Sequence, residues 1–225
     1  MSHDELQFVR AIKTGERLIP ARANIMAEDD PDPGISTIFS GWAIRYKTIG
    51  HGRRQVLDIL LPGDLIGLQS EMTGKMRHSI RAVTEVRVCS LNSARFHDMF
   101  TVQPALSEAL VATLLVEEHR ADTRLLLLGQ QRPTERLGWF LLELRERLQR
   151  RGEMVDEGFD LPLSYEQLSD TIGVSRSQIG ASLRDMKSRG WARLQDRRLT
   201  FVDAAKMTRE CEYSELPDPS TRTLI

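Results

Sequence analysis

The apolar positions between residues 163 and 202 first repeat at helical spacing and then alternate. Leu168 and Ile172, four residues apart, predict one short helix. A second helix is predicted by three apolar residues spaced four and three apart, which are Ile179, Leu183 and Met186. Residues 191–194 and 199–202 then predict two strands around the polar turn 195–198. We expect Ile179, Leu183 and Trp191 to form the core of this segment.

Both predicted helices carry the same start signal. Ser164 is followed three residues later by Gln167, and Ser175 by Gln178, which is the Ser-x-x-Gln form of a capping box. Gly173 ends the first helix, because a left-handed cap costs glycine little. Two capped helices separated by a glycine turn and followed by a hairpin predict a winged helix-turn-helix. The second helix of that motif enters the major groove of DNA.

Charge supports the same interpretation. Residues 174–200 hold seven Arg or Lys against two Asp, although the whole chain has a net charge of −1. A solvated charged face would explain these arginines alone, but not the two caps, the turn and the hairpin together. For base contacts we predict Arg176, Ser177 and Gln178, although Gln178 cannot easily serve the cap and a base at once. For phosphate contacts we predict Ser164, Ser175, Lys187, Arg193 and Arg197.

The pattern is different between residues 35 and 89. Short apolar runs at 35–39, 42–49 and 55–61 are separated by glycine turns, and residues 80–88 alternate as one half-buried strand does. Several short strands at this spacing predict a β-sandwich or small barrel. The preceding residues 4–34 are acidic and end in a turn-rich loop.

A long helix is predicted from about residue 104 to 128. Six positions fit a and d of consecutive heptads, and five are apolar: Val111, Leu114, Glu118, Ala121, Leu125 and Leu128. A dimer coiled coil follows, with Glu118 as an objection or as a polar group that fixes the register. The alternative is a helix packed on its own domain, which the additional apolar residues favour (Leu110, Leu115, Leu126 and Leu127). We favour the dimer, because a two-half-site operator requires a symmetric partner.

Residues 129–133 are expected to break this helix and to act as an interdomain hinge. A further helix is predicted from 134 to about 149, with a buried stripe of Leu137, Phe140, Leu141, Leu144 and Leu148. The acidic tail beyond 207 is expected to fray or to pack loosely. The expected domains are therefore 1–103, 104–130, 131–207 and the tail 208–225.

Composition excludes several classes of protein. The 225 residues are 40% hydrophobic, and no apolar run approaches the ~20 residues of a membrane span. The mixed, acidic start is not that of a signal peptide, so we expect a cytoplasmic protein without a membrane partner. Two distant cysteines, Cys89 and Cys211, are too few for a disulfide framework, a four-Cys zinc site or a four-Cys iron–sulfur cluster. No metal site is predicted.

Together these segments resemble the cyclic-AMP receptor / fumarate–nitrate reduction regulator (Crp/Fnr) family. The resemblance is carried by residues 40–43, 52–70 and 135–148 and by the helix-turn-helix. The sequence of residues 63–69 is closer to the Fnr-like branch of the family. It implies an α+β fold with an N-terminal cyclic-nucleotide-binding-like β-roll (jelly roll), a long dimerisation helix and a C-terminal winged helix-turn-helix. It also implies a homodimeric transcription regulator that senses a small signal.

The candidate effector pocket departs from the cyclic-AMP-binding pattern. That pattern has a Gly-Glu pair and a later Arg-Ser or Arg-Thr, whereas this chain offers Gly67, Gln69, Arg77 and Ser79. A cyclic phosphate needs a positioned cation and amide donors, so cyclic AMP is not the expected effector. The cluster cysteines of the oxygen-sensing branch are missing, which argues against an iron–sulfur cluster. Haem stays open, with candidate axial ligands in His51, His78, His97, His119, Met72 and Met76.

The second helix departs as well. Family members often carry Arg-Glu-Thr-Val-x-Arg, and here Ser177 and Ala181 replace the glutamate and the second arginine. We therefore expect a palindromic double-stranded operator that differs from the family's common half-site, with RNA polymerase as a further candidate partner. One rival is an effector-binding module whose winged domain binds a protein. A cupin-like enzyme is the other, but residues 35–90 contain no His-x-His.

Overall fold

The computed structural model describes residues 2–216 of the chain. It contains two compact units, which divide between Glu117 and Glu118. The division falls inside one long helix, so the first unit ends and the second begins on the same element. Each unit is described by itself below.

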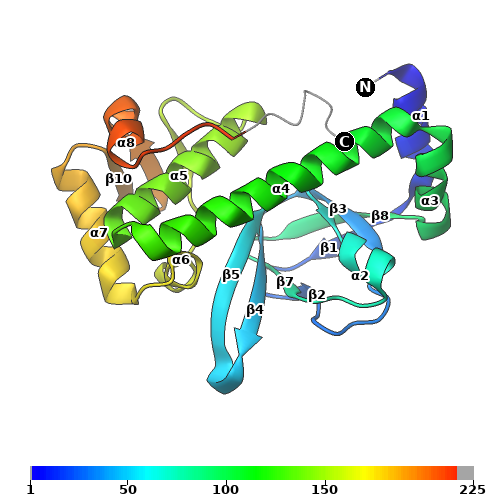
Figure 1. The fold of residues 1–225 in the computed structure, drawn as a ribbon, viewed down its shortest axis with the longest axis horizontal. Helices are drawn as coiled ribbons and strands as arrows, with labels where there is room; N and C mark the ends of the chain where they lie inside the picture. The colour runs from blue at the N-terminus through cyan, green and yellow to red at the C-terminus, as the bar shows by residue number, and fades with distance from the viewer. Residues whose placement is uncertain (1, 217–225) are drawn as a thin grey trace. The chain divides into compact units, whose positions relative to one another are not determined.

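The first unit is a β-roll of two four-stranded antiparallel sheets (Figure 1). One sheet has the order β1-β8-β3-β6 and the other the order β2-β7-β4-β5. The strands are β1 (Lys13–Ile19), β2 (Asn24–Met26), β3 (Ile35–Ser40), β4 (Ala43–Ile49), β5 (Arg53–Leu60), β6 (Leu65–Ile66), β7 (Ser79–Ala82) and β8 (Val86–Leu91). The predicted jelly roll is confirmed.

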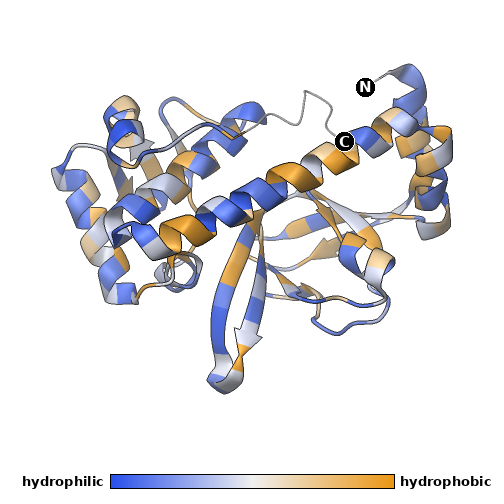
Figure 2. Ribbon diagram, in the orientation of Figure 1, coloured by the Kyte–Doolittle hydropathy of each residue, from blue (hydrophilic) through white to orange (hydrophobic). Residues whose placement is uncertain are grey.

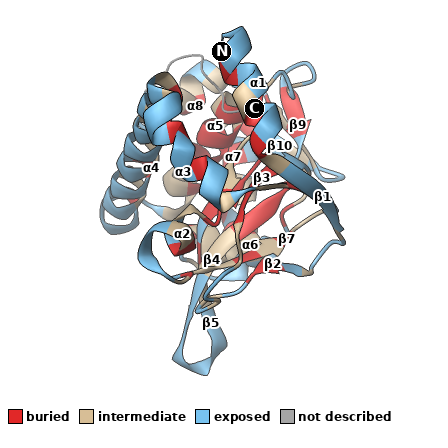
Figure 3. Cartoon of the chain, turned by 90° about the vertical axis from the view of Figure 1, so that its right-hand side faces the viewer, coloured by how far each residue is buried: buried red, intermediate tan, exposed pale blue. Residues whose placement is uncertain are grey.

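The interior of the β-roll is filled by apolar side chains from both sheets. Ile38, Met76 and Val86 are fully buried, and Met26 and Ile80 are almost so. A second cluster lies under the N-terminal helix α1 (His3–Ile12), where Phe96 and Met99 of α3 (Ser93–Val102) are buried. Figure 3 shows buried residues on the central strands and an exposed hairpin at the far end of β5.

The prediction of a single strand at 80–88 is wrong. β7 and β8 lie in different sheets, and the chain crosses between them at residues 83–85. The crossing is held at Trp42, whose carbonyl accepts from Val83 N at 2.7 Å and whose N–H donates to Thr84 Oγ1 at 2.9 Å. The apolar alternation continues through the turn, which is why the sequence looked like one strand.

Besides α3, two helices in this unit were not predicted. α1 is capped by Ser2, whose side chain forms a capping box with Glu5. α2 (Leu68–Thr73) begins after Gly67, which has a φ of 85°. Residues 4–34 thus hold α1, β1 and β2 before the turn-rich loop.

The predicted long helix is α4 (Pro104–Gln130), and it continues two residues beyond the expected end. The break at 129–133 is shorter than predicted, because α5 (Pro133–Arg150) begins directly after Gln131 and Arg132. No single helix among residues 2–216 is both long and apolar enough to cross a membrane. By length and composition taken together, only α3 and α4 as a pair would suffice, and that pair is bent by 106°.

The second unit contains α5 and a winged helix-turn-helix. Its remaining elements are β9 (Gly158–Asp160), α6 (Tyr165–Ile172), α7 (Arg176–Ser188), β10 (Ala192–Gln195), β11 (Arg198–Phe201) and α8 (Ala204–Glu210). The hairpin is tighter than predicted, since the turn consists of Asp196 and Arg197, both with positive φ. β9 pairs with β11 as a third strand that the sequence did not reveal.

The expectation of a loose tail is wrong for residues 208–216. Tyr213 donates to the Glu146 carboxylate and packs against Trp139 at 5.3 Å between ring centroids. Leu216 is buried, and its carbonyl accepts from Arg150 at 2.9 Å. The remainder of the predicted tail, 217–225, lies outside the described residues.

Candidate DNA-binding and dimerisation surfaces

The helix-turn-helix is built by the two predicted capping boxes. Ser164 Oγ accepts from Gln167 N at 3.2 Å, and Ser175 Oγ accepts from Gln178 N at 3.3 Å. In return, each glutamine Oε1 accepts from the backbone N–H of its serine at 2.8 Å. Gly173 separates the helices with φ 71° and ψ 41°, the left-handed cap that was predicted.

One face of α7 is buried and the opposite face is open. Ile179, Ser182 and Met186 point into the core, together with Trp191 after the helix. Leu183 is only partly buried, so the prediction that it belongs to the core holds in part. The exposed face carries Arg176, Ser177, Ala181, Arg184 and Lys187.

Gln178 is held by the cap. Its Oε1 accepts from Ser175 N at 2.8 Å and from Ser175 Oγ at 3.0 Å. Bidentate recognition of adenine requires that oxygen as an acceptor for the base. Gln178 can therefore contact a base through its amide N–H groups, but reading adenine with both atoms would break the cap.

The seven basic residues of 174–200 separate into two groups. Arg189 is paired with Asp185 at 3.0 Å and Glu135 at 3.3 Å and lies over the Trp191 ring, and these carboxylates raise its pKa. Arg198 donates to the Val155 carbonyl at 2.7 Å and is bridged to Asp160. The other five are exposed: Arg176, Arg184, Lys187, Arg193 and Arg197. Only this exposed group is positioned for a large anionic partner.

Arg184 is absent from the residues predicted for DNA contact. It lies on the same face of α7 as Ser177 and Ala181, because the intervals of four and three residues follow the helix turn. The same periodicity was visible in the sequence. Arg176 itself lies 3.5 Å from Glu166 of α6, with 68% of its side chain exposed.

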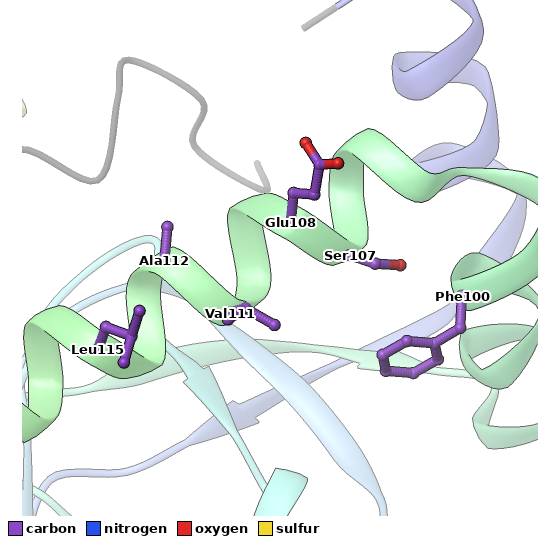
Figure 4. Close-up of a pocket in the computed structure, with 6 residues that line it drawn as sticks. All are labelled: Phe100, Ser107, Glu108, Val111, Ala112 and Leu115. Carbon is purple, nitrogen blue, oxygen red and sulfur yellow. The ribbon is translucent and has the colours of Figure 1, made fainter.

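The predicted seam on α4 is open to solvent. All six seam residues are exposed, including Val111 at 52%, Leu114 at 44% and Leu125 at 71%. Figure 3 shows most of α4 as exposed, and Figure 2 shows bands of apolar residues along it. Beside Val111, the Phe100 ring turns toward α4 over a shallow apolar pocket (Figure 4). This pocket is lined by Phe100, Ser107, Glu108, Val111, Ala112 and Leu115.

Of the additional apolar residues of α4, two agree with a helix packed on its own domain and two agree with a dimer surface. Leu110 and Leu127 are buried, which accounts for their apolar character by packing on their own unit. Leu115 and Leu126 are 58% and 62% exposed and widen the open apolar surface instead. An unpartnered apolar helix surface of this kind is typical of an interaction site.

The four residues of the candidate effector pocket are engaged locally. Gln69 Oε1 accepts from Arg77 N at 3.1 Å, and Ser79 Oγ accepts from Glu28 N at 3.0 Å. Gly67 lies against the Gly34 carbonyl, which a Cβ at this position would meet at 2.0 Å. The structure brings Gln69 and Arg77 together. At Gly67 the close backbone of Gly34 leaves no space for a side chain.

Three of the candidate axial ligands have defined surroundings. Met76 is buried in the β-roll core, and His97 Nε2 lies 2.8 Å from Glu71 Oε1. Burial, with Arg45 and Lys47 nearby, lowers the pKa of His78 to about 4, so that this imidazole is neutral at pH 7. Among the described residues, no group of three or more His, Cys, Asp or Glu side chains could hold a metal ion.

Known proteins share this organisation. Residues 16–102 match the model of the cyclic nucleotide-binding domain, and residues 135–210 match that of the Crp-like helix-turn-helix domain. The chain is 25% identical over 211 residues to the transcriptional activator protein FnrL of Cereibacter sphaeroides, covering 92% of this chain and 82% of that protein. It is 29% identical to the nitrogen fixation regulation protein FixK of Azorhizobium caulinodans, covering 90% and 81%.

Among solved structures, FixK2 from Bradyrhizobium japonicum matches with a TM-score of 0.78 and 22% identity, covering 92% of this chain and all of that one. The fold and its two matched domains define a DNA-binding transcription regulator with a sensor-type β-roll. The chain belongs to the Crp/Fnr family, consistent with its Fnr-like branch. That family consists of transcription regulators rather than enzymes.

Proposed function

We propose that this chain acts as a cytoplasmic homodimer that binds an inverted-repeat DNA operator. The observation that carries the proposal is the exposed basic face of α7, which begins at a fully formed cap and presents Arg176 and Arg184. Cations along an exposed recognition helix match the phosphates and the guanine edges of a duplex. The exposed seam of α4 supplies a surface for a second copy.

In this proposal, residues 1–103 form the sensor, 104–130 the dimerisation helix and hinge, and 131–207 the DNA-binding domain. Gly67, Gln69, Arg77 and Ser79 mark the proposed effector position in the sensor. The proposed base contacts are Arg176, Ser177 and Gln178 through its amide N–H groups. Ser164, Ser175, Lys187, Arg193 and Arg197 are the proposed phosphate contacts, and RNA polymerase is the partner that a DNA-bound activator would contact.

The proposal is tested by selecting the purified protein against a random duplex library at near-physiological salt. Enrichment of an inverted repeat with half-sites about one helical turn apart, 10–10.5 bp, is the expected result. Selection is repeated with a cell extract to supply an effector. If neither selection enriches a sequence, and binding to random duplex does not fall with salt, the proposed function is wrong.

Replacing Arg176 with alanine is expected to lower the affinity for the selected site by about 1–3 kcal/mol and to relax the preference at one base position. The reason is that a guanidinium fork reads guanine through two hydrogen bonds that alanine cannot make. Gel-shift titrations against the selected site and single-base variants measure both effects.

The matched control is Arg197→Ala, in the wing. As a proposed phosphate contact, it should weaken binding to all sequences alike and reduce the salt slope by about one. If Arg176→Ala left the discrimination between selected and scrambled sites unchanged, the base-reading role of Arg176 would be excluded.

A further inference from the structure

A buried carboxylate joins α5 to the C-terminal half of α4. Glu143 of α5 is fully buried, and its Oε1 lies 2.7 Å from Arg120 Nη2. Arg124 Nη2 donates to both oxygens of Glu143, at 2.9 and 3.0 Å. A third cation, Arg147 on α5, lies 3.8 Å from the same Oε1. All four residues belong to the second compact unit.

Joining two helices through buried charges has a high cost in desolvation free energy. Removing charged groups from water costs several kcal/mol per ion, and a well-packed apolar contact often gives equal or greater stability. The ion pairs instead fix the orientation of the two helices, because two guanidinium groups can contact one carboxylate in only one arrangement. An apolar contact would allow α4 and α5 to slide and repack.

Two further hydrogen bonds hold the connection between α4 and α5. Arg136 Nη1 of α5 donates to the Leu128 carbonyl near the end of α4 at 2.9 Å. Gln131, between the helices, donates through its side chain to the Cys211 carbonyl at 2.9 Å. One side chain therefore bonds α5 to the end of α4, and another bonds the connecting residues to the residue after α8.

Contacts continue from this joint to the recognition helix. α5 packs against α6, α7 and α8, and Glu135 of α5 lies 3.3 Å from Arg189, which caps the end of α7. On the other side of the joint, Leu125 and Leu128 are exposed on the same segment of α4 that holds Arg124. The dimer-seam residues 118–130 and the helix-turn-helix thus belong to one compact unit, with Glu143 at the joint.

We propose that Glu143 is a positioning residue for DNA binding. By fixing α5 on α4, it fixes the direction of α7 relative to the axis of the dimer, and so sets the half-site spacing that the protein accepts. The inference rests on the proposed homodimer and operator. Glu143 contacts no base and acts only through the arrangement of the helices.

The test compares the full-length protein with two variants on operators of altered spacing. Glu143→Gln retains the shape but removes the charge that balances the arginines. The second variant replaces Glu143, Arg120 and Arg124 together with leucine, so that no charge of this trio is left unpaired and the fold is maintained by apolar packing. The matched control is Glu146→Gln on the same helix, because Glu146 contacts Arg150 and Tyr213 rather than α4.

Affinities are measured for the selected inverted repeat, for the same repeat with two base pairs added or removed at its centre, and for sites with mutated bases. The parent and Glu146→Gln should discriminate strongly against the altered spacings. In the leucine variant, and in Glu143→Gln if it folds, that discrimination should fall by roughly tenfold, a typical size for coupling between sites. Discrimination against mutated bases should be unchanged, which a general loss of structure would not produce.

A folded leucine variant that retains the parental spacing preference would overturn the role of Glu143 and leave the proposed function intact. An equal loss of spacing discrimination in Glu146→Gln would also overturn it, because the effect would not depend on the α4–α5 joint. A parent protein that binds the selected half-site but accepts every spacing would refute both the positioning role and the proposed two-half-site operator.

Discussion

A protein that carries both Leu114→Glu and Leu125→Glu is expected to sediment as a monomer and to lose about 100-fold or more in affinity for its inverted repeat. Both leucines are exposed on α4, at 44% and 71%, so each presents apolar surface to water in the single chain. Two carboxylates in a dimer seam would be desolvated against their symmetry mates, which opposes association. The two half-sites would then be bound independently.

Analytical ultracentrifugation and titration of the selected operator measure the two effects. The matched control is Leu18→Glu, an exposed leucine that belongs to β1 rather than to α4, at 58% exposure. This variant should remain dimeric and bind normally. Dimers of the double variant with the parental association constant would exclude α4 as the dimer interface.

Replacing Trp191 with alanine is expected to lower the free energy of unfolding of the C-terminal unit by about 3–5 kcal/mol. Trp191 is fully buried between the recognition helix and the wing, and its ring approaches α5 at Gly138, where a Cβ would lie 3.4 Å from Cζ3. The alanine leaves a cavity that three elements border. Chemical denaturation followed by circular dichroism measures the change.

Val202→Ala is the control, since this residue follows the wing and is 63% exposed. Its effect should stay within about 0.5 kcal/mol. A loss below about 1 kcal/mol for Trp191→Ala would mean that the ring is not part of a tightly packed core. Specific DNA affinity should fall in parallel with the folded fraction of the Trp191 variant.

The sequence by itself determined the helix-turn-helix. Both capping boxes, the left-handed Gly173 and the apolar spacing of Ile179 and Met186 are local features, formed by residues within a few positions of one another. Local backbone and side-chain bonds decide such elements wherever the segment lies in the fold. The long helix, its apolar seam positions and a β-sandwich or small barrel followed from periodicity in the same way, whereas the jelly roll was implied by the family resemblance.

Only the tertiary structure decided the features that depend on distant partners. The alternation at 80–88 is identical for one strand and for two, and the bonds from Trp42 turn it into two strands in different sheets. The acidic tail looked unattached until Tyr213 and Leu216 met the Glu146 region of α5. The Glu143 cluster joins residues 19 to 23 positions apart. Pairing between distant residues leaves no periodic signal, because its energy depends on which surfaces the folded chain brings together.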